Sequence, residues 1–103
     1  MDAAVKKALD TALANWAAMG KASQEEAEGT ADGFEASFYA FVDTFREWVN
    51  RLKPRPQTME QLLALPEVSE LTERLPAPLY LNFETEAEFI LEHVIRDEED
   101  KYD

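Results

Sequence analysis

Acidic side chains at regular spacing are the groups of this sequence most able to do chemistry. Glu67, Glu70 and Glu73 recur every three residues, and Asp97 and Asp100 repeat that spacing further along the chain. Side chains three residues apart lie on the same face of a helix. Paired carboxylate oxygens are ligands that Mg²⁺ accepts, and a bound Mg²⁺ stabilises charge on a transferring phosphoryl group. These five carboxylates therefore define one candidate metal site.

The spacing is similar to a motif of the all-helical nucleoside-triphosphate pyrophosphohydrolases, which hold magnesium with Glu-x-x-Glu and Glu-x-x-Asp pairs on neighbouring helices. The resemblance implies magnesium-dependent hydrolysis of a nucleotide, with the five carboxylates as ligands. It covers two short motifs, and the second pair here is Asp-x-x-Asp. A chain with 22 acidic residues among 103 reaches such spacings by chance. We therefore keep the hydrolase as an alternative and assign no catalytic residue and no cofactor.

Other catalytic arrangements find no support in the sequence. The absence of Cys excludes disulfides, thiolate metal sites and cysteine nucleophiles. His93 is the single imidazole, whereas helical di-iron sites need two Glu-x-x-His elements. Gly20, Gly29 and Gly33 lack the spacing of a phosphate-binding loop. We expect His93 to lie on a solvated helix face.

Charge is the most distinctive surface property of the chain. With 22 acidic and 10 basic residues the net charge is −12, and such a field repels phosphates and anionic membranes. We therefore expect no direct nucleic-acid binding and no membrane binding. The charge is uneven, because residues 46–55 hold four basic and one acidic side chain, whereas residues 84–103 hold nine acidic and two basic ones.

This segregation predicts two contact surfaces of opposite sign. The basic end would contact an anionic partner, and the acidic end would contact a basic protein. Pairing of the two segments within the chain is the alternative interpretation. Tyr39 points to a different side of its helix from Phe38 and Phe41, which makes it a further surface candidate. The candidate partner-binding residues are Tyr39, Arg46, Arg51, Lys53 and Arg55.

Aromatic residues dominate one predicted helix, which covers residues 34–52. At about 100° per residue six of its apolar side chains fall within an arc of about 80°. Aromatic residues at helical spacing usually form core. A homodimer that pairs the stripes of two copies is a further interpretation, because the alanine-rich first helix offers little apolar surface. The stripe consists of Phe34, Phe38, Phe41, Phe45, Trp48 and Leu52.

Capping signals and prolines divide the remaining chain. Asp2 is placed to cap a helix over residues 3–19, and Thr58 opens short helices that extend to residue 75 around Pro66. The prolines at 76 and 78 and the alternating apolar residues that follow predict an extended segment near 76–83. Thr85 has the spacing of another capping box, before a helix of about 86–97. Residues 23–33 are compatible with helix or loop, since two glycines weaken a helix there.

The sequence thus predicts an all-α protein, a small helical bundle of three long amphipathic helices plus one or two short helices around Pro66. We expect a single domain over residues 1–96 and an acidic, frayed tail over 97–103. No secretory signal and no apolar stretch of about 20 residues is present, so we expect a cytoplasmic protein. The leading functional hypothesis is protein–protein interaction, as an adaptor, inhibitor or regulator. The alternatives are the magnesium-dependent hydrolase and an acidic mimic of nucleic acid.

Overall fold

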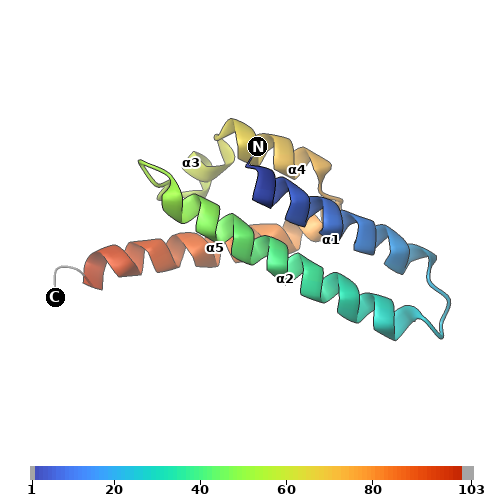
Figure 1. Cartoon of the computed structure of the whole chain (residues 1–103). Helices are drawn as coiled ribbons and strands as arrows, with labels where there is room; N and C mark the ends of the chain where they lie inside the picture. The colour runs from blue at the N-terminus through green and yellow to red at the C-terminus, as the bar shows by residue number, and fades with distance from the viewer. Residues whose placement is uncertain (1, 101–103) are drawn as a thin grey trace. The chain divides into compact units, whose positions relative to one another are not determined.

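The structure is a computed structural model, and it describes the backbone of residues 2–100 and the side chains of residues 2–92. Within these residues every regular element is a helix, so the all-α class is confirmed (Figure 1). No helix in the described part of the chain is long and apolar enough to cross a membrane. The helices are α1 (Ala3–Lys21), α2 (Ala27–Arg51), α3 (Met59–Leu63), α4 (Pro66–Arg74) and α5 (Ala77–Asp100).

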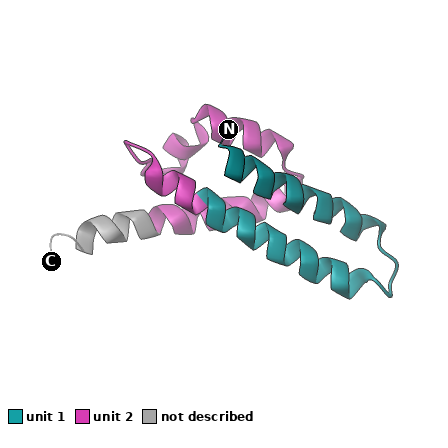
Figure 2. Cartoon of the chain, viewed as in Figure 1, with its two compact units in different colours: residues 1–45 teal, residues 46–103 magenta. Residues whose placement is uncertain are grey.

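Contacts along the chain cluster into two compact units, residues 1–45 and residues 46–103, and the boundary falls inside α2 (Figure 2). Such a unit is not by itself an independent domain, so the single domain over 1–96 stays a prediction. Helix α5 is assigned through Asp100. The side chains from residue 93 onward and residues 101–103 lie outside the described part, so the fraying of 97–103 also stays a prediction.

Unit 1 is a helical hairpin of α1 and the first part of α2 (Figure 1). The start of α1 is fixed by Asp2, whose carboxylate accepts hydrogen bonds from the backbone N–H groups of Ala4 and Val5, both at 3.1 Å. The predicted cap is therefore confirmed. It satisfies N–H groups that have no acceptor within the first turn of the helix.

The connection between the two helices of unit 1 is a short turn. The N–H of Glu26 donates to the carbonyl of Ser23 at 3.1 Å, and α2 begins at Ala27. Residues 27–33, left open between helix and loop by the sequence, are therefore helical. The preceding helix continues through Lys21, and no residue of the described chain has a positive φ. Gly20 therefore lies inside α1, which ends one residue later.

The core of unit 1 is aromatic. Trp16 of α1 lies with its ring 5.3 Å from that of Phe34, and both residues are half-buried. Along α2 the ring of Phe41 lies 6.1 Å from that of Phe38 and 6.2 Å from that of Phe45. The prediction that the stripe forms core is confirmed for these three buried rings. The buried residues of the unit are Val5, Leu9, Ala12, Phe38, Phe41, Val42 and Phe45.

Burial of the stripe bears on the predicted homodimer. Phe38, Phe41 and Phe45 are 5%, 0% and 1% exposed in a single chain, whereas Phe34 and Trp48 are half-buried. A second copy is therefore not needed to cover most of the aromatic surface. The homodimer through these residues stays a prediction. Its main motive, an aromatic stripe exposed in the single chain, does not hold for the three buried rings.

Unit 2 contains the end of α2 and helices α3, α4 and α5, with α3 in contact with both α4 and α5. Helix α3 starts at the predicted capping box. The hydroxyl oxygen of Thr58 accepts from the N–H of Gln61 at 3.1 Å, as the box predicts. The side-chain oxygen of Gln61 accepts at 2.9 Å from the N–H of Gln57, one residue before the cap, and not from that of Thr58. Pro66 occupies the first turn of α4, where a missing N–H costs no helical bond. The two short helices around Pro66 are thus confirmed.

The extended segment predicted near 76–83 is wrong, because α5 begins at Ala77. The carbonyl of Pro76 accepts a hydrogen bond from the N–H of Tyr80 at 2.9 Å, which closes the first turn. Pro78 lies in that same turn, where its missing N–H leaves no helical acceptor unpaired. The two prolines therefore mark the start of a helix.

The alternating apolar residues of this segment fit a helix once their burial is known. Leu79 and Phe83 are one turn apart and only 1% and 2% exposed, whereas Leu81 points outward. Thr85 lies inside the helix, and its hydroxyl donates to the carbonyl of Leu81 at 3.1 Å, so a capping box at this residue is also wrong. The buried residues of unit 2 are Val49, Pro56, Leu62, Val68, Leu71, Leu79, Phe83, Ala87, Ile90 and Leu91.

Candidate functional site

The most exposed large apolar side chains of the described chain lie on α5. Leu81 is 66% exposed and Phe89 is 60% exposed, and the next in order is Tyr39 of α2 at 49%. Five exposed residues between Leu81 and Glu92 project within an arc of about 100° around α5, at about 100° per residue. We call this side the outer face of α5, and it consists of the exposed residues Leu81, Thr85, Glu88, Phe89 and Glu92.

The outer face exists because α5 carries apolar residues on two sides. Its buried side forms part of the core of unit 2 and consists of Leu79, Phe83, Ala87, Ile90 and Leu91. Leu81 and Phe89 lie off that side and are eight residues apart, which corresponds to about 12 Å along the helix axis. Thr85 lies between them, and its hydroxyl is bound to the helix backbone. The two apolar groups are therefore held on a regular helix.

Carboxylates surround these two apolar groups. Glu88 and Glu92 are exposed on the outer face itself, and Glu84 and Glu86 are half-buried beside it. A ligand that covers Leu81 must therefore also approach negative charge. Apolar side chains combined with Lys or Arg meet both requirements, because they bury the apolar groups and pair with the carboxylates.

The predicted partner-binding residues occupy different places. Tyr39 belongs to unit 1, where its ring makes an edge contact with Phe38 at 6.0 Å and an interplanar angle of 72°. Four basic residues belong to unit 2, of which Arg55 is half-buried and the others are exposed. These four residues are Arg46, Arg51, Lys53 and Arg55.

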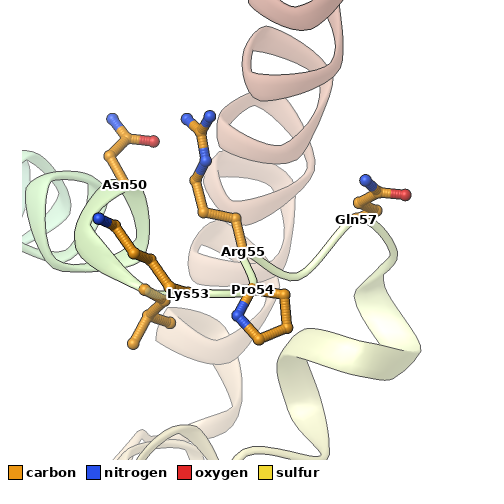
Figure 3. A pocket seen from close by; sticks show the side chains of 6 residues that line it. Asn50, Lys53, Pro54, Arg55 and Gln57 are labelled. Atoms are coloured by element: carbon orange, nitrogen blue, oxygen red, sulfur yellow. The ribbon is translucent and has the colours of Figure 1, made fainter.

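Two of these basic residues line one pocket. Lys53 and Arg55 share a pocket of about 440 Å³ with Asn50 and Gln57 in the loop after α2 (Figure 3). Arg46 and Arg51 are not among its lining residues. The structure therefore brings together half of the basic set.

The carboxylates proposed for magnesium do not form a site in the described residues. Glu67 is half-buried on α4, and Glu70 and Glu73 are exposed. No group of three or more His, Asp or Glu residues with described side chains could hold a metal ion. Asp97 and Asp100, like His93, have side chains outside the described residues. The hydrolase therefore stays a prediction, with no support from the residues that can be placed.

Sequence reasoning missed the outer face of α5. The extended segment predicted near 76–83 contains Leu81 and gives it no helix face. Phe89 lies one residue before the buried pair Ile90 and Leu91 and on a different side of the helix. A helical projection that starts at Ala77 would have found both residues on one side of the helix.

None of the known protein families, curated proteins or solved structures compared with the chain matches it. The chemistry of its surface is therefore the basis on which a function is proposed.

Proposed function

We propose that the protein acts through protein–protein interaction, by binding a basic amphipathic helix of another protein on the outer face of α5. The observation that carries the proposal is the exposure of Leu81 and Phe89, at 66% and 60%, on one side of a regular helix. An amphipathic helix that lays its apolar side on a partner is a common form of recognition.

The apolar part of the contact has a definite size. Complete burial of a Leu or Phe side chain from water is worth about 1.5–3 kcal/mol. Because Leu81 and Phe89 are each about three-fifths exposed, a partner that covers them would gain about 1–2 kcal/mol from each. The cost of association reduces this sum, so the contact needs further interactions around it.

The carboxylates supply those interactions and select the partner. Glu88 shares the face with the apolar pair, and the whole chain carries a net charge of −12. A partner with Lys or Arg beside its apolar residues gains attraction in approach and pairing. A second copy of this chain would bring the same glutamates and the same net charge to the interface. A basic partner is therefore favoured over self-association.

This activity agrees with a role as adaptor, inhibitor or regulator, and we propose the cytoplasm as its compartment, as the sequence predicts. The hydrolase receives no comparable support, because the described side chains form no group that could hold a metal ion. The mimic of nucleic acid stays an alternative.

The proposal can be tested while the partner is still unidentified. A displayed library of random peptides is selected on the wild-type protein and counter-selected on the double variant Leu81→Ser, Phe89→Ser. We expect enriched peptides with apolar residues at helical spacing and an excess of Lys and Arg. We expect their affinity to fall about 5- to 30-fold for each single variant, since the loss of about 1–2 kcal/mol is set against about 1.4 kcal/mol for a factor of ten.

Tyr39→Ser is the matched control, because it also removes an exposed aromatic or apolar side chain, but from unit 1. Peptides that depend on Tyr39 and ignore Leu81 would contradict the proposal, and so would enriched peptides with no basic excess. Sedimentation of the protein alone provides a second check. A dimer that Leu81→Ser dissociates would show that a second copy occupies the face, which would also overturn the proposal.

A further inference from the structure

The part of unit 1 on either side of the turn, residues 13–37, holds apolar side chains that the chain covers only in part. The structure describes every residue of this range, and none of them is buried. Four large apolar side chains of the range are half-buried, those of Leu13, Trp16, Met19 and Phe34. Two packed helices alone do not enclose a core, so this part of the hairpin leaves apolar surface that a further element can cover.

The ring contact between the two helices shows which way each of them faces. The rings of Trp16 and Phe34 lie 5.3 Å apart, so these residues mark the facing direction of α1 and of α2, which lie side by side (Figure 1). At about 100° per residue, Asn15 and Gly33 each project about 100° to one side of that direction. The side chain of Asn15 donates to the carbonyl of Gly33 at 3.4 Å, which agrees with this placement. We call this the Asn15 side of unit 1.

The opposite side of the hairpin is apolar along its middle and acidic along one edge. Leu13 of α1 and Ala31 of α2 each project about 60° from the facing direction, and both are half-buried. Further out lie Ala17 on α1 and the carboxylates of Glu28 and Glu35 on α2, all three exposed. We call this surface the Leu13 side of unit 1, and it consists of these five residues.

The pattern of the Leu13 side fits a helix that carries its charge on one edge. Such a helix, laid along the hairpin, would cover Leu13 and Ala31 with its apolar stripe and act as the third helix of a bundle. Glu28 and Glu35 are seven residues apart, which is about 10 Å along α2, so basic side chains two turns apart on the partner can pair with both. On α1 the small side chain of Ala17 lets an uncharged edge approach closely.

The charge of this part of the chain favours a basic partner over a second copy. Residues 13–37 contain five acidic side chains and one basic side chain, and all six are exposed. A second copy would bring the same excess of negative charge to the contact, which opposes association. A partner with Lys or Arg beside its apolar stripe gains attraction instead.

We propose that the Leu13 side of unit 1 binds an amphipathic helix of a partner protein, with Lys or Arg two turns apart on the edge that faces α2. The bound helix completes this part of the hairpin as a three-helix bundle. The surface belongs to unit 1, so the proposal goes beyond the function proposed for the outer face of α5 and does not depend on it. A chain with both surfaces can hold two basic helices, as an adaptor does.

The test uses the full chain with Leu81→Ser and Phe89→Ser, so that the outer face of α5 does not contribute. The ¹⁵N-labelled protein is titrated with a synthetic helix that carries a leucine stripe, lysines two turns apart on one edge and alanine elsewhere. A second peptide has glutamate in place of the lysines. We expect saturable shifts of the Trp16 indole N–H and of the amides of residues 13–37 with the lysine helix only. Binding of both peptides, or of neither, would overturn the proposal.

Two pairs of matched variants locate the contact. Leu13→Ala should weaken binding of the lysine helix about two- to fivefold, whereas Met19→Ala, which truncates a half-buried side chain on the Asn15 side of α1, should leave it unchanged. Glu35→Lys should weaken it about three- to tenfold at low salt, whereas Glu70→Lys, the same change at an exposed position of α4, should weaken it less. Equal effects within either pair would overturn the proposal, and the exposed glutamates keep the test valid if Leu13→Ala does not fold.

Discussion

Replacing Gly33 with Ala should stabilise the protein, and the size of the gain follows from its place in α2. Gly33 is exposed in the second turn of the helix, and a Cβ atom built on it meets nothing within 4 Å. Its carbonyl accepts a hydrogen bond from the side chain of Asn15 at 3.4 Å, which Ala retains. The substitution therefore adds helix propensity without a clash.

The expected gain is about 0.5–1 kcal/mol, the difference between Ala and Gly in an exposed helix interior. Unfolding entropy near 60 °C is about 2.1 cal/mol/K per residue, so for 103 residues this gain corresponds to an increase in Tm of about 2–5 °C. Far-UV circular dichroism followed through thermal unfolding measures it. Ala36→Gly, the reverse change at an exposed position of the same helix, should lower Tm by a similar amount.

A decrease in Tm for Gly33→Ala would refute the reasoning. It would mean that residues 27–33 are not an exposed helix, or that this glycine adopts a backbone conformation that Ala cannot. No change in Tm for both variants would show that this end of α2 is already unfolded before the transition.

Three further substitutions test separate parts of the structure. Thr58→Ala should lower the free energy of unfolding by about 1 kcal/mol in urea denaturation, because it removes the cap of α3, and an unchanged midpoint would contradict that role. Phe83→Ala should cost about 3–5 kcal/mol whereas Phe89→Ala should cost less than about 0.5 kcal/mol, and equal costs would show that the two sides of α5 are misassigned. Lys6→Ala should lower the free energy of unfolding by at most about 0.5 kcal/mol, because the 3.3 Å ion pair of Lys6 with Asp10 is exposed. Urea denaturation at low and at high salt measures it, and a larger loss that persists at high salt would contradict this.

Local signals predicted much of the fold. Asp2 and Thr58 cap helices as their spacing indicated, because a side-chain oxygen beside the first turn has an unpaired N–H within reach. The aromatic residues of α2 follow a helical period over about four turns, and a strand, whose side chains alternate with a period of two, does not produce that pattern. These predictions rest on contacts between residues close in sequence.

The start of α5 shows where that reasoning ends. Leu79, Leu81 and Phe83 alternate in a way that fits a strand, yet the pair four apart, Leu79 and Phe83, is buried on one side of a helix. A short apolar run can fit both the period of two of a strand and the period of 3.6 of a helix. Which of the two forms depends on the rest of the protein that packs against the segment. Thr85 gave a false capping signal for a related reason, since its hydroxyl has a second acceptor in the carbonyl one turn earlier.

The candidate site was harder to predict than the fold. The exposure of Phe89 depends on which side of α5 is covered, and the sequence does not contain that information. The sequence shows the cluster of basic residues, but it does not show which of them line the same pocket. Lys53 and Arg55 line one pocket in the loop after α2, whereas Arg46 and Arg51 lie on the helix before it.

The central claim is that the outer face of α5 binds a basic amphipathic helix, and one titration tests it most directly. The ¹⁵N-labelled protein is titrated with a synthetic helix of leucine and lysine, and with a peptide of the same composition whose order destroys the helical period. We predict saturable shifts at the amides of residues 81–92 with the first peptide only, and their loss in the variant Leu81→Ser, Phe89→Ser. Equal binding of both peptides, or shifts unaffected by the double variant, would contradict the claim.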